Sequence, residues 1–353
     1  MSGGVDSSVA AALLKSQGYD VIGVTMHIWD EDPETTSGDR SCCSLEAVED
    51  ARRVAARLDI PYYVMNFKDV FREKVVDYFT KEYLNGRTPN PCIACNRYIK
   101  FDALLQKAIS MDIDYVATGH YARVEFDCVS GRYMIKKAVD EHKDQTYALY
   151  NLTQDQLKRT LFPLGAYTKD EIRKLAEDLE MKVASKPDSQ EICFIPDNDY
   201  AGFIEENVEE SIRPGNFVDM DGNVLGRHKG IIHYTVGQRK GLGISIGRPA
   251  YVLRIDPDRN EVVLGDNRNV FAKGLIASDL NFVSTGGIES KVIADVKIRY
   301  TAKATRATIE PIDDDKVKVV FDEPARAITP GQSAVFYDGD MVLGGGVIDK
   351  VLI

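Results

Sequence analysis

The sequence predicts an α/β protein with a doubly wound parallel sheet, followed by a β-rich part. Early in the chain, short apolar segments rich in β-branched residues alternate with segments of helical periodicity, a pattern typical of parallel βαβ units. A glycine-rich turn leads directly into the first of these helices. From Arg213 onward, turns such as Asp221-Gly222 separate short alternating segments, which indicates strands joined by tight turns.

The first stretch, from Ser2 to Ser8, has the composition of a phosphate-binding turn (Ser-Gly-Gly-Val-Asp-Ser-Ser). Two consecutive glycines let the backbone approach a ligand, and their N–H groups can form an anion nest. The residues from Asp6 to Lys15 favour a helix, so Ser7 and Ser8 lie at a helix N-terminus, where phosphate is stabilised. No Gly-Lys-Ser or Gly-Lys-Thr follows the glycines, which excludes a Walker A loop.

The run Ser-Gly-Gly-Val-Asp-Ser resembles the loop of the ATP pyrophosphatases, which bind ATP and release pyrophosphate while they adenylate a substrate. An ordinary glycine-rich turn is the alternative, but the match of the whole run in order favours the phosphate loop. The resemblance implies ATP contacts from Ser2, Gly3, Gly4, Val5, Asp6 and Ser7. Such a loop should follow a buried strand, and nothing precedes Met1. We therefore expect that the chain starts at an internal methionine or has lost its first strand.

The elements that follow are predicted from their periodicity. Strands are expected at Asp20–His27, Pro61–Asn66 and Asp114–Thr118, and helices at Leu45–Leu58 and Val70–Asn85. Further along come a hairpin over Ala122–Val139, a helix that a capping box opens at Thr168-x-x-Glu171, and a small β-barrel from about Leu280 to the end.

Ligands of parallel sheets bind beyond the carboxyl ends of the strands, and this rule selects three candidates. Met26 is either an adenine contact or a plain core methionine. Gly119 allows a nucleotide to come close to the backbone, so we count it with the ATP-binding residues. His120 is either a ligand contact or a hydrogen-bonded loop histidine.

Several cysteines stand in settings that favour a reactive thiol or a metal. We expect a stiff loop over Gly86–Asn96, with a helix starting near Asn96, so that Cys95 lies by a helix N-terminus that lowers its pKa. Arg87 adds positive charge nearby. The spacing Cys92-x-x-Cys95 in an intracellular protein is typical of metal or redox sites. Cys193, within Ser185–Pro196, is either reactive or a small core residue, and adjacent Cys42 and Cys43 are expected to be structural.

Composition limits the class of protein. The 353 residues suggest two or three domains, and no long apolar run or export leader is present. We therefore expect a soluble cytoplasmic protein that does not enter a membrane. A net charge of −11 argues mildly against nucleic acid. Two basic clusters nevertheless predict a phosphate-contacting face, namely Arg227-His228-Lys229 and Gln238-Arg239-Lys240.

The complete set of motifs resembles the bacterial tRNA-specific 2-thiouridylases, which place sulfur on C2 of the wobble uridine. The motifs occur in order after the phosphate loop, at Asn90–Asn96, Ala117–Tyr121, Lys143–Gln145 and Glu191–Phe194. The resemblance implies three domains, which we place at residues 1–198 (ATP-pyrophosphatase type), 199–279 (small central domain) and 280–353 (barrel that grips tRNA).

The resemblance also implies a role for individual residues. Cys95 is the expected nucleophile and Cys193 the expected persulfide carrier, and the two end as a disulfide. The target base is expected to meet Asn90, Pro91 and Cys92. The rest of the tRNA is expected to meet His120, Lys143, Asp144, Gln145, Arg299, Tyr300 and Gln332.

These roles imply ATP with Mg²⁺, a tRNA substrate, and a sulfur donor such as a cysteine desulfurase or a sulfur-relay protein. Adenylation of the C2 oxygen makes it a leaving group, and a flipped-out base can reach the site. A 4Fe–4S cluster on Cys92, Cys95 and Cys193 is the alternative sulfur carrier. We favour the persulfide, because the family also uses Asp at the position of Cys92 and a carboxylate is a hard ligand. An amidating ligase would leave the cysteines unexplained, and a non-catalytic RNA-binding protein would leave the ATP loop unexplained.

Overall fold

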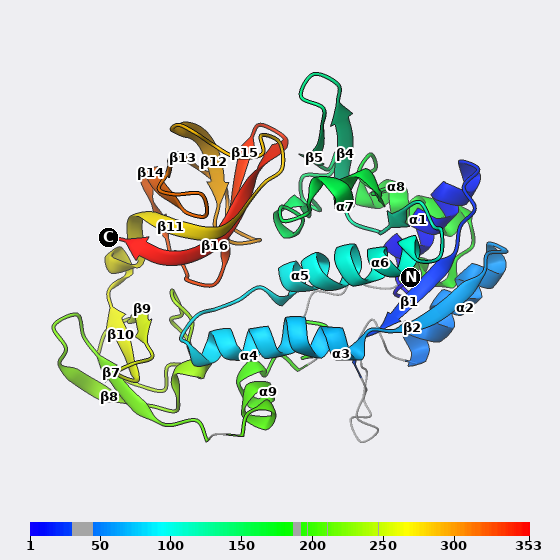
Figure 1. Ribbon diagram of the computed structural model, residues 1–353. Coiled ribbons are helices and arrows are strands. Elements are labelled where there is room, and N and C mark those ends of the chain that lie inside the picture. Colours follow the sequence, from blue (N-terminus) through cyan, green and yellow to red (C-terminus); the bar gives the residue numbers. More distant parts are fainter. Residues whose placement is uncertain (30–44, 186–191, 196, 210, 246) are drawn as a thin grey trace. The chain divides into compact units, whose positions relative to one another are not determined.

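The structure is a computed structural model of the chain and describes residues 1–29, 45–185, 192–195, 197–209, 211–245 and 247–353 (Figure 1). Cys42 and Cys43 lie outside these residues, as does most of the segment around Cys193. The described chain forms two compact units. The first unit comprises residues 1–75, 92–198 and 340–342, and the second comprises 76–91, 199–339 and 343–353.

The first unit is an α/β structure with parallel strands, as predicted. Strand β1 (Gly23–His27) pairs in parallel with β2 (Tyr62–Asn66), and β3 (Val116–Ala117) pairs in parallel with β6 (Thr160–Leu161). The helices that accompany these strands include α1 (Val5–Ser16), α2 (Leu45–Arg57) and α8 (Lys169–Asp178). Helices α1 and α8 contribute Val9, Ala12, Ile172 and Ala176 to one buried core. Burial of these apolar residues holds α1, the helix that follows the glycine-rich turn, against α8.

The strands and helices of this unit lie where the periodicity places them, although the strands are shorter than expected. The hairpin consists of β4 (Ala122–Asp127) and β5 (Arg132–Lys137). The capping box at the start of α8 is complete, because Thr168 Oγ1 accepts from the N–H of Glu171 (3.3 Å) and the Glu171 carboxylate accepts from the N–H of Thr168 (2.7 Å). A further short helix of this unit is α7 (Gln154–Lys158), and α9 (Tyr200–Asn207) belongs to the second unit.

The helix boundaries before and around Cys92 and Cys95 differ from the prediction. The segment after Asn66 forms α3 (Lys68–Phe71), a π-helical stretch (Arg72–Val76) and α4 (Asp77–Leu84). The next helix begins at Pro91, not near Asn96. It runs through α5 (Pro91–Ala94), a second π-helical stretch (Cys95–Ala103) and α6 (Leu104–Ile109). Proline has its φ angle preset for the first helical position and needs no hydrogen-bond partner for its nitrogen there, so a proline that we assigned to a loop starts the helix.

The second unit contains a small sheet and a barrel. The sheet has the order β8-β7-β10-β9, formed by β7 (Gly215–Val218), β8 (Val224–His228), β9 (Tyr251–Asp256) and β10 (Glu261–Gly265). The barrel strands follow the order β11-β14-β13-β12-β15-β16, and β16 pairs with β11 to close the ring. Closure leaves no unpaired strand edge in the described barrel.

The barrel confirms the predicted C-terminal architecture, but it starts at Phe271 and not at Leu280. Its strands are β11 (Phe271–Phe282), β12 (Val292–Lys297), β13 (Thr305–Pro311), β14 (Val317–Arg326), β15 (Ser333–Asp338) and β16 (Met341–Leu352). None of the described helices has the length and apolar character that a membrane crossing requires.

Candidate functional site

The phosphate loop leads directly into α1, as expected. Gly4 is the N-cap of this helix, and no described side chain caps it. The hydroxyl of Ser7 accepts from the N–H of Ser2 (3.1 Å), and the hydroxyl of Ser8 donates to the carbonyl oxygen of Gly4 (2.8 Å). The turn is therefore closed by its own serines, while the first N–H groups of α1 point along the helix dipole. This arrangement suits an anion such as the phosphates of ATP.

Two glycines allow the loop to pack as it does. Gly3 has a φ angle of +66°, and a Cβ atom built on it would lie 2.3 Å from the carbonyl oxygen of Ala47 at the start of α2. A Cβ atom on Gly119 would lie 2.8 to 2.9 Å from atoms of Asp6 and Ser7. Gly119 therefore packs against the phosphate loop itself. The sequence predicts that Gly119 lets a nucleotide come close to the backbone, but it does not reveal that the loop itself lies this close.

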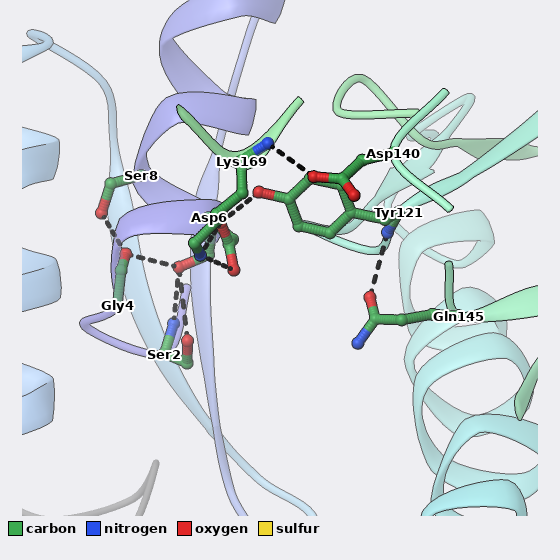
Figure 2. A network of polar contacts seen from close by, with 9 residues as sticks. Ser2, Gly4, Asp6, Ser8, Tyr121, Asp140, Gln145 and Lys169 are labelled. Carbon is green, nitrogen blue, oxygen red and sulfur yellow. Dashed lines mark hydrogen bonds and ion pairs between the residues drawn. The ribbon is translucent and has the colours of Figure 1, made fainter. Parts of the chain in front are cut away.

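An ion pair beside the loop was not expected from the sequence. The ammonium group of Lys169 donates to both carboxylate oxygens of Asp6, at 2.8 and 2.9 Å, and the hydroxyl of Tyr121 donates to the same carboxylate at 2.9 Å (Figure 2). The side chain of Lys169 is 6% exposed. Its backbone N–H donates to Asp140 at 3.0 Å, which helps to keep the pKa of Asp140 below its usual value. Asp6 is therefore neutralised by a buried cation.

The Lys143–Gln145 segment contacts this network. The side-chain oxygen of Gln145 accepts from the N–H of Tyr121 at 3.0 Å (Figure 2). The N–H of Gln145 donates to the carbonyl oxygen of Tyr121 at 2.9 Å. Asp144 is buried and accepts from the N–H of Ala138 and the hydroxyl of Thr146. Asp144 therefore stabilises its own turn. Lys143, which carries the positive charge of this segment, is half-buried.

His120 is buried between aromatic rings. Its Nδ1 lies 2.7 Å from the hydroxyl of Thr118, and its ring centre is 5.9 Å from those of Phe101 and Phe162. Burial, with a smaller contribution from the charge of Lys100, lowers the pKa of His120 well below its usual value. The ring is therefore neutral at physiological pH. Met26 is half-buried near the end of β1, where it pairs with Met65 of β2.

The three candidate thiols differ in exposure. Cys92 is exposed, Cys95 is buried within the first turns of the helix that starts at Pro91, and Cys193 is half-buried. Cys92 and Cys95 are three residues apart, which places them on one helix face. Next to Cys193, Phe194 packs against Trp29 and Phe71. Within the described parts of the chain, no cluster of three or more His, Cys, Asp or Glu side chains is arranged to hold a metal ion.

Other candidate residues belong to the second unit. The side-chain amide of Gln332 donates to the carbonyl oxygens of Thr88 (2.8 Å) and Pro89 (3.3 Å), directly before Asn90 and Pro91. Arg299 donates to Val236, Ala327 and Thr329, so its guanidinium supports loops of this unit. Tyr300 is exposed, and the ammonium of Lys297 lies 5.4 Å from its ring centre.

Two expectations about charge need correction. Arg87 forms ion pairs with Glu82 (2.7 Å) and Asp349 (3.4 Å), which offset the positive charge that we expected near the thiols. His228 is buried, with Nδ1 accepting from the N–H of Gly230 and Nε2 donating to the carbonyl oxygen of Asn260, both at 3.1 Å. Burial lowers its pKa, so His228 is a neutral structural residue and not part of a phosphate-contacting face.

The other members of the two basic clusters are accessible. Arg227, Lys229, Arg239 and Lys240 are exposed. Arg239 and Arg248 also line an open cavity of about 470 Å³ formed by the glycine-rich segment up to Ala250. Exposed guanidinium and ammonium groups beside an open hollow are suited to contact a phosphate backbone.

Comparison with known protein families matches nearly the whole chain. Residues 1–197 match the tRNA methyl transferase HUP domain, residues 201–266 the tRNA methyl transferase PRC-barrel domain, and residues 272–348 the aminomethyltransferase beta-barrel domain. These three matches agree with the α/β part, the small sheet and the barrel described above.

Individual relatives cover the full length. The tRNA-specific 2-thiouridylase MnmA of Acetivibrio thermocellus is 62% identical over 349 residues, which are 99% of this chain and 97% of the relative. The protein of the same name from Clostridioides difficile is 58% identical over 352 residues, covering 100% and 97%. Among solved structures, the U34-tRNA thiolase NcsA from Methanococcus maripaludis with its 4Fe-4S cluster matches at 20% identity and a TM-score of 0.34, over 59% of this chain and 65% of that one. That likeness is too weak to carry an argument.

Proposed function

For a chain that belongs to the tRNA-specific 2-thiouridylase family, we propose that ATP activates the C2 oxygen of a wobble uridine in tRNA and that a cysteine-bound sulfur replaces it. The uncapped N-terminus of α1 behind its serine-closed turn is the observation that carries the proposal. It offers N–H donors to phosphates, and Gly119 lets a strand end close on the same turn. An oxide ion is a very poor leaving group, so the exchange of oxygen for sulfur requires such activation.

The nucleotide is expected to bind as its Mg²⁺ complex. When bound, it supplies the adenylyl group that makes the C2 oxygen a leaving group, and pyrophosphate is released. The residues from Ser2 to Ser7 hold the phosphates, and Met26 at the end of β1 lies toward the adenine. Lys169 and Tyr121 fix the carboxylate of Asp6.

The sulfur transfer uses Cys193 and Cys95. The terminal sulfur of a Cys193 persulfide forms the bond to C2, and AMP leaves with the oxygen. The Cys95 thiolate then attacks the Sγ of Cys193, which releases the thiolated base and leaves a Cys95–Cys193 disulfide. A dithiol reductant returns both thiols. The role of Cys95 follows from the family resemblance. The helix starts at Pro91, so Cys95 is its fifth residue and lies beyond the first turn, where the helix dipole would stabilise a thiolate most.

A 4Fe–4S cluster is the second candidate for the sulfur carrier. Three thiols, Cys92, Cys95 and Cys193, are a donor set suited to such a cluster, and two of them lie on one helix face. If a cluster is present, these residues would hold it, and it would supply an open iron for sulfur. We favour the persulfide because a carboxylate can stand at the position of Cys92 in the family.

The substrate contacts follow from the same assignment. We assign Asn90, Pro91 and Cys92 to the target base, and exposed Tyr300 with the basic loops to the rest of the tRNA. The remaining proposed tRNA residues are His120, Lys143, Asp144, Gln145, Arg299 and Gln332, several of which fix neighbouring segments as described above. The domain limit at 198/199 stays a prediction, as do the sulfur donor and the cytoplasmic location.

The first test is ATP–pyrophosphate exchange with and without tRNA. We expect exchange that depends on a tRNA with a wobble uridine, and its absence would contradict the proposed activation. Cys193→Ser should keep the activation step and lose thiolation, whereas Cys128→Ser, in an exposed position, should keep both. Measurement of iron and sulfide in anaerobically purified protein distinguishes the persulfide from the cluster. Activity of iron-free protein supplied with a persulfide would exclude the cluster, and activity that tracks iron content would exclude the persulfide.

A further inference from the structure

Lys169 is a buried cation at the edge of the phosphate loop. It is the first residue of α8, and only 6% of its side chain is exposed. The backbone N–H donates to Asp140, and the ammonium donates to both oxygens of Asp6. The ammonium also lies 5.7 Å from the centre of the Tyr121 ring. Both ends of the residue are therefore held in place (Figure 2).

Asp6, the partner of Lys169, lies where its charge affects phosphate binding. Asp6 is in the first turn of α1, beside the N–H groups that are proposed to take the phosphates. An uncompensated carboxylate there would compete with the phosphates for the positive end of the helix dipole. It would also repel the triphosphate, and water screens this repulsion only in part, because 31% of the Asp6 side chain is exposed. A loop that binds a polyanion therefore needs this charge to be cancelled.

We propose that Lys169 is a positioning residue for ATP, which neutralises Asp6 and directs its carboxylate away from the phosphate-binding N–H groups. The hydroxyl of Tyr121 completes the arrangement by donating to the same carboxylate. The backbone of Tyr121 is bonded in turn to Gln145, so the ion pair is built into a fixed network. This inference rests on the ATP-dependent reaction proposed above. It predicts that Lys169 matters for ATP binding only while Asp6 carries its charge.

The test is a double-mutant cycle read out by binding of Mg²⁺-ATP. Dissociation constants are measured by calorimetry for the unaltered chain, Lys169→Met, Asp6→Asn and the double variant. Lys174→Met is the matched control, because Lys174 is an exposed lysine of the same helix. Adenosine serves as a second ligand, since it lacks phosphates and should bind equally to all variants. Thermal melting of each variant reports whether it is folded.

We expect Lys169→Met to weaken ATP binding about tenfold or more in the presence of Asp6, with no effect on adenosine and none from Lys174→Met. In the Asp6→Asn background, Lys169→Met should leave ATP binding unchanged. If Lys169→Met does not fold alone, the comparison in the Asp6→Asn background decides, because the double variant leaves no buried charge unpaired. Thermal melting reports whether Asp6→Asn, which leaves the buried ammonium of Lys169 without its carboxylate partner, is folded. A tenfold loss there would overturn the inference and show that Lys169 contacts phosphate directly.

Unchanged ATP binding by Lys169→Met in the presence of Asp6 would also overturn the inference. Both results are distinct from failure of the proposed function. If the unaltered chain itself does not bind ATP, the proposed activation step is wrong.

Discussion

The side-chain amide of Gln332 donates to the carbonyl oxygen of Thr88 at 2.8 Å, across 244 residues of sequence. The N–H of Thr88 donates in turn to the carbonyl oxygen of Pro330 at 2.9 Å. The residues directly before Asn90 are therefore bonded to the turn that precedes β15 of the barrel. Because Asn90 and Pro91 are proposed to meet the target base, the barrel contributes to the position of that segment in addition to its proposed contacts with tRNA.

Gln332→Ala should release this segment. Loss of two hydrogen bonds should lower the free energy of unfolding by about 1–2 kcal/mol, speed amide exchange at Thr88 and reduce thiolation, with ATP binding unchanged. Gln154→Ala is the matched control, since Gln154 also makes two bonds to backbone, both with Tyr133 in the first unit. Equal exchange at Thr88 in Gln332→Ala and the unaltered chain would contradict the prediction.

Gly119→Ala should disturb the phosphate loop, because the added methyl group would lie 2.8 to 2.9 Å from Asp6 and Ser7. We expect a loss of about 1–3 kcal/mol in stability from overpacking together with weaker ATP binding. Calorimetry and thermal melting measure the two effects. Ala117→Ser, at an exposed position of the preceding strand, is the control. ATP binding equal to that of the control would show that the loop tolerates the shift.

The exposed basic loop should contribute to tRNA binding despite the net charge of −11. The double variant Arg239→Ala with Lys240→Ala should bind tRNA more weakly, and the slope of log affinity against log salt should fall by about one unit for each phosphate that the variant no longer neutralises. Exchange of the two residues for each other, Arg239→Lys with Lys240→Arg, keeps the charge and should keep the slope. If tRNA affinity and the salt slope are unchanged when both charges are removed, the loop does not contact tRNA.

His120 should make the folded protein sensitive to mild acid. Its pKa is lowered in the folded state by burial, so below the usual histidine value the unfolded chain binds more protons than the folded chain. Stability should therefore be fully present above about pH 6.5 and fall as the pH drops below it, by up to about 1.4 kcal/mol per pH unit. Denaturation measured at several pH values should show a flatter profile for His120→Asn. The exposed His142→Asn should retain the original slope, and an unchanged slope in His120→Asn would refute the assignment.

Local patterns in the sequence were sufficient to predict much of the fold and the outline of the site. The glycine pair and helix formers predict the turn and α1, the capping box predicts the start of α8, and alternating segments with tight turns predict the barrel. These features depend on residues close together in the chain, so their physical causes are visible in the sequence. The helix start at Pro91 was missed because a proline fits both a loop and a first helical turn.

Contacts between distant residues were decided only by the tertiary structure. The ion pair of Lys169 with Asp6 joins residues 163 positions apart, and nothing near either residue indicates the other. His228 shows the same limit, since its basic neighbours suggest a charged surface while its burial keeps it neutral. Periodicity and turn chemistry determine which segments become helices and strands. Which polar side chains then meet, and which lose their charge, depends on how those segments pack, because burial and partner distance arise only after the chain has folded.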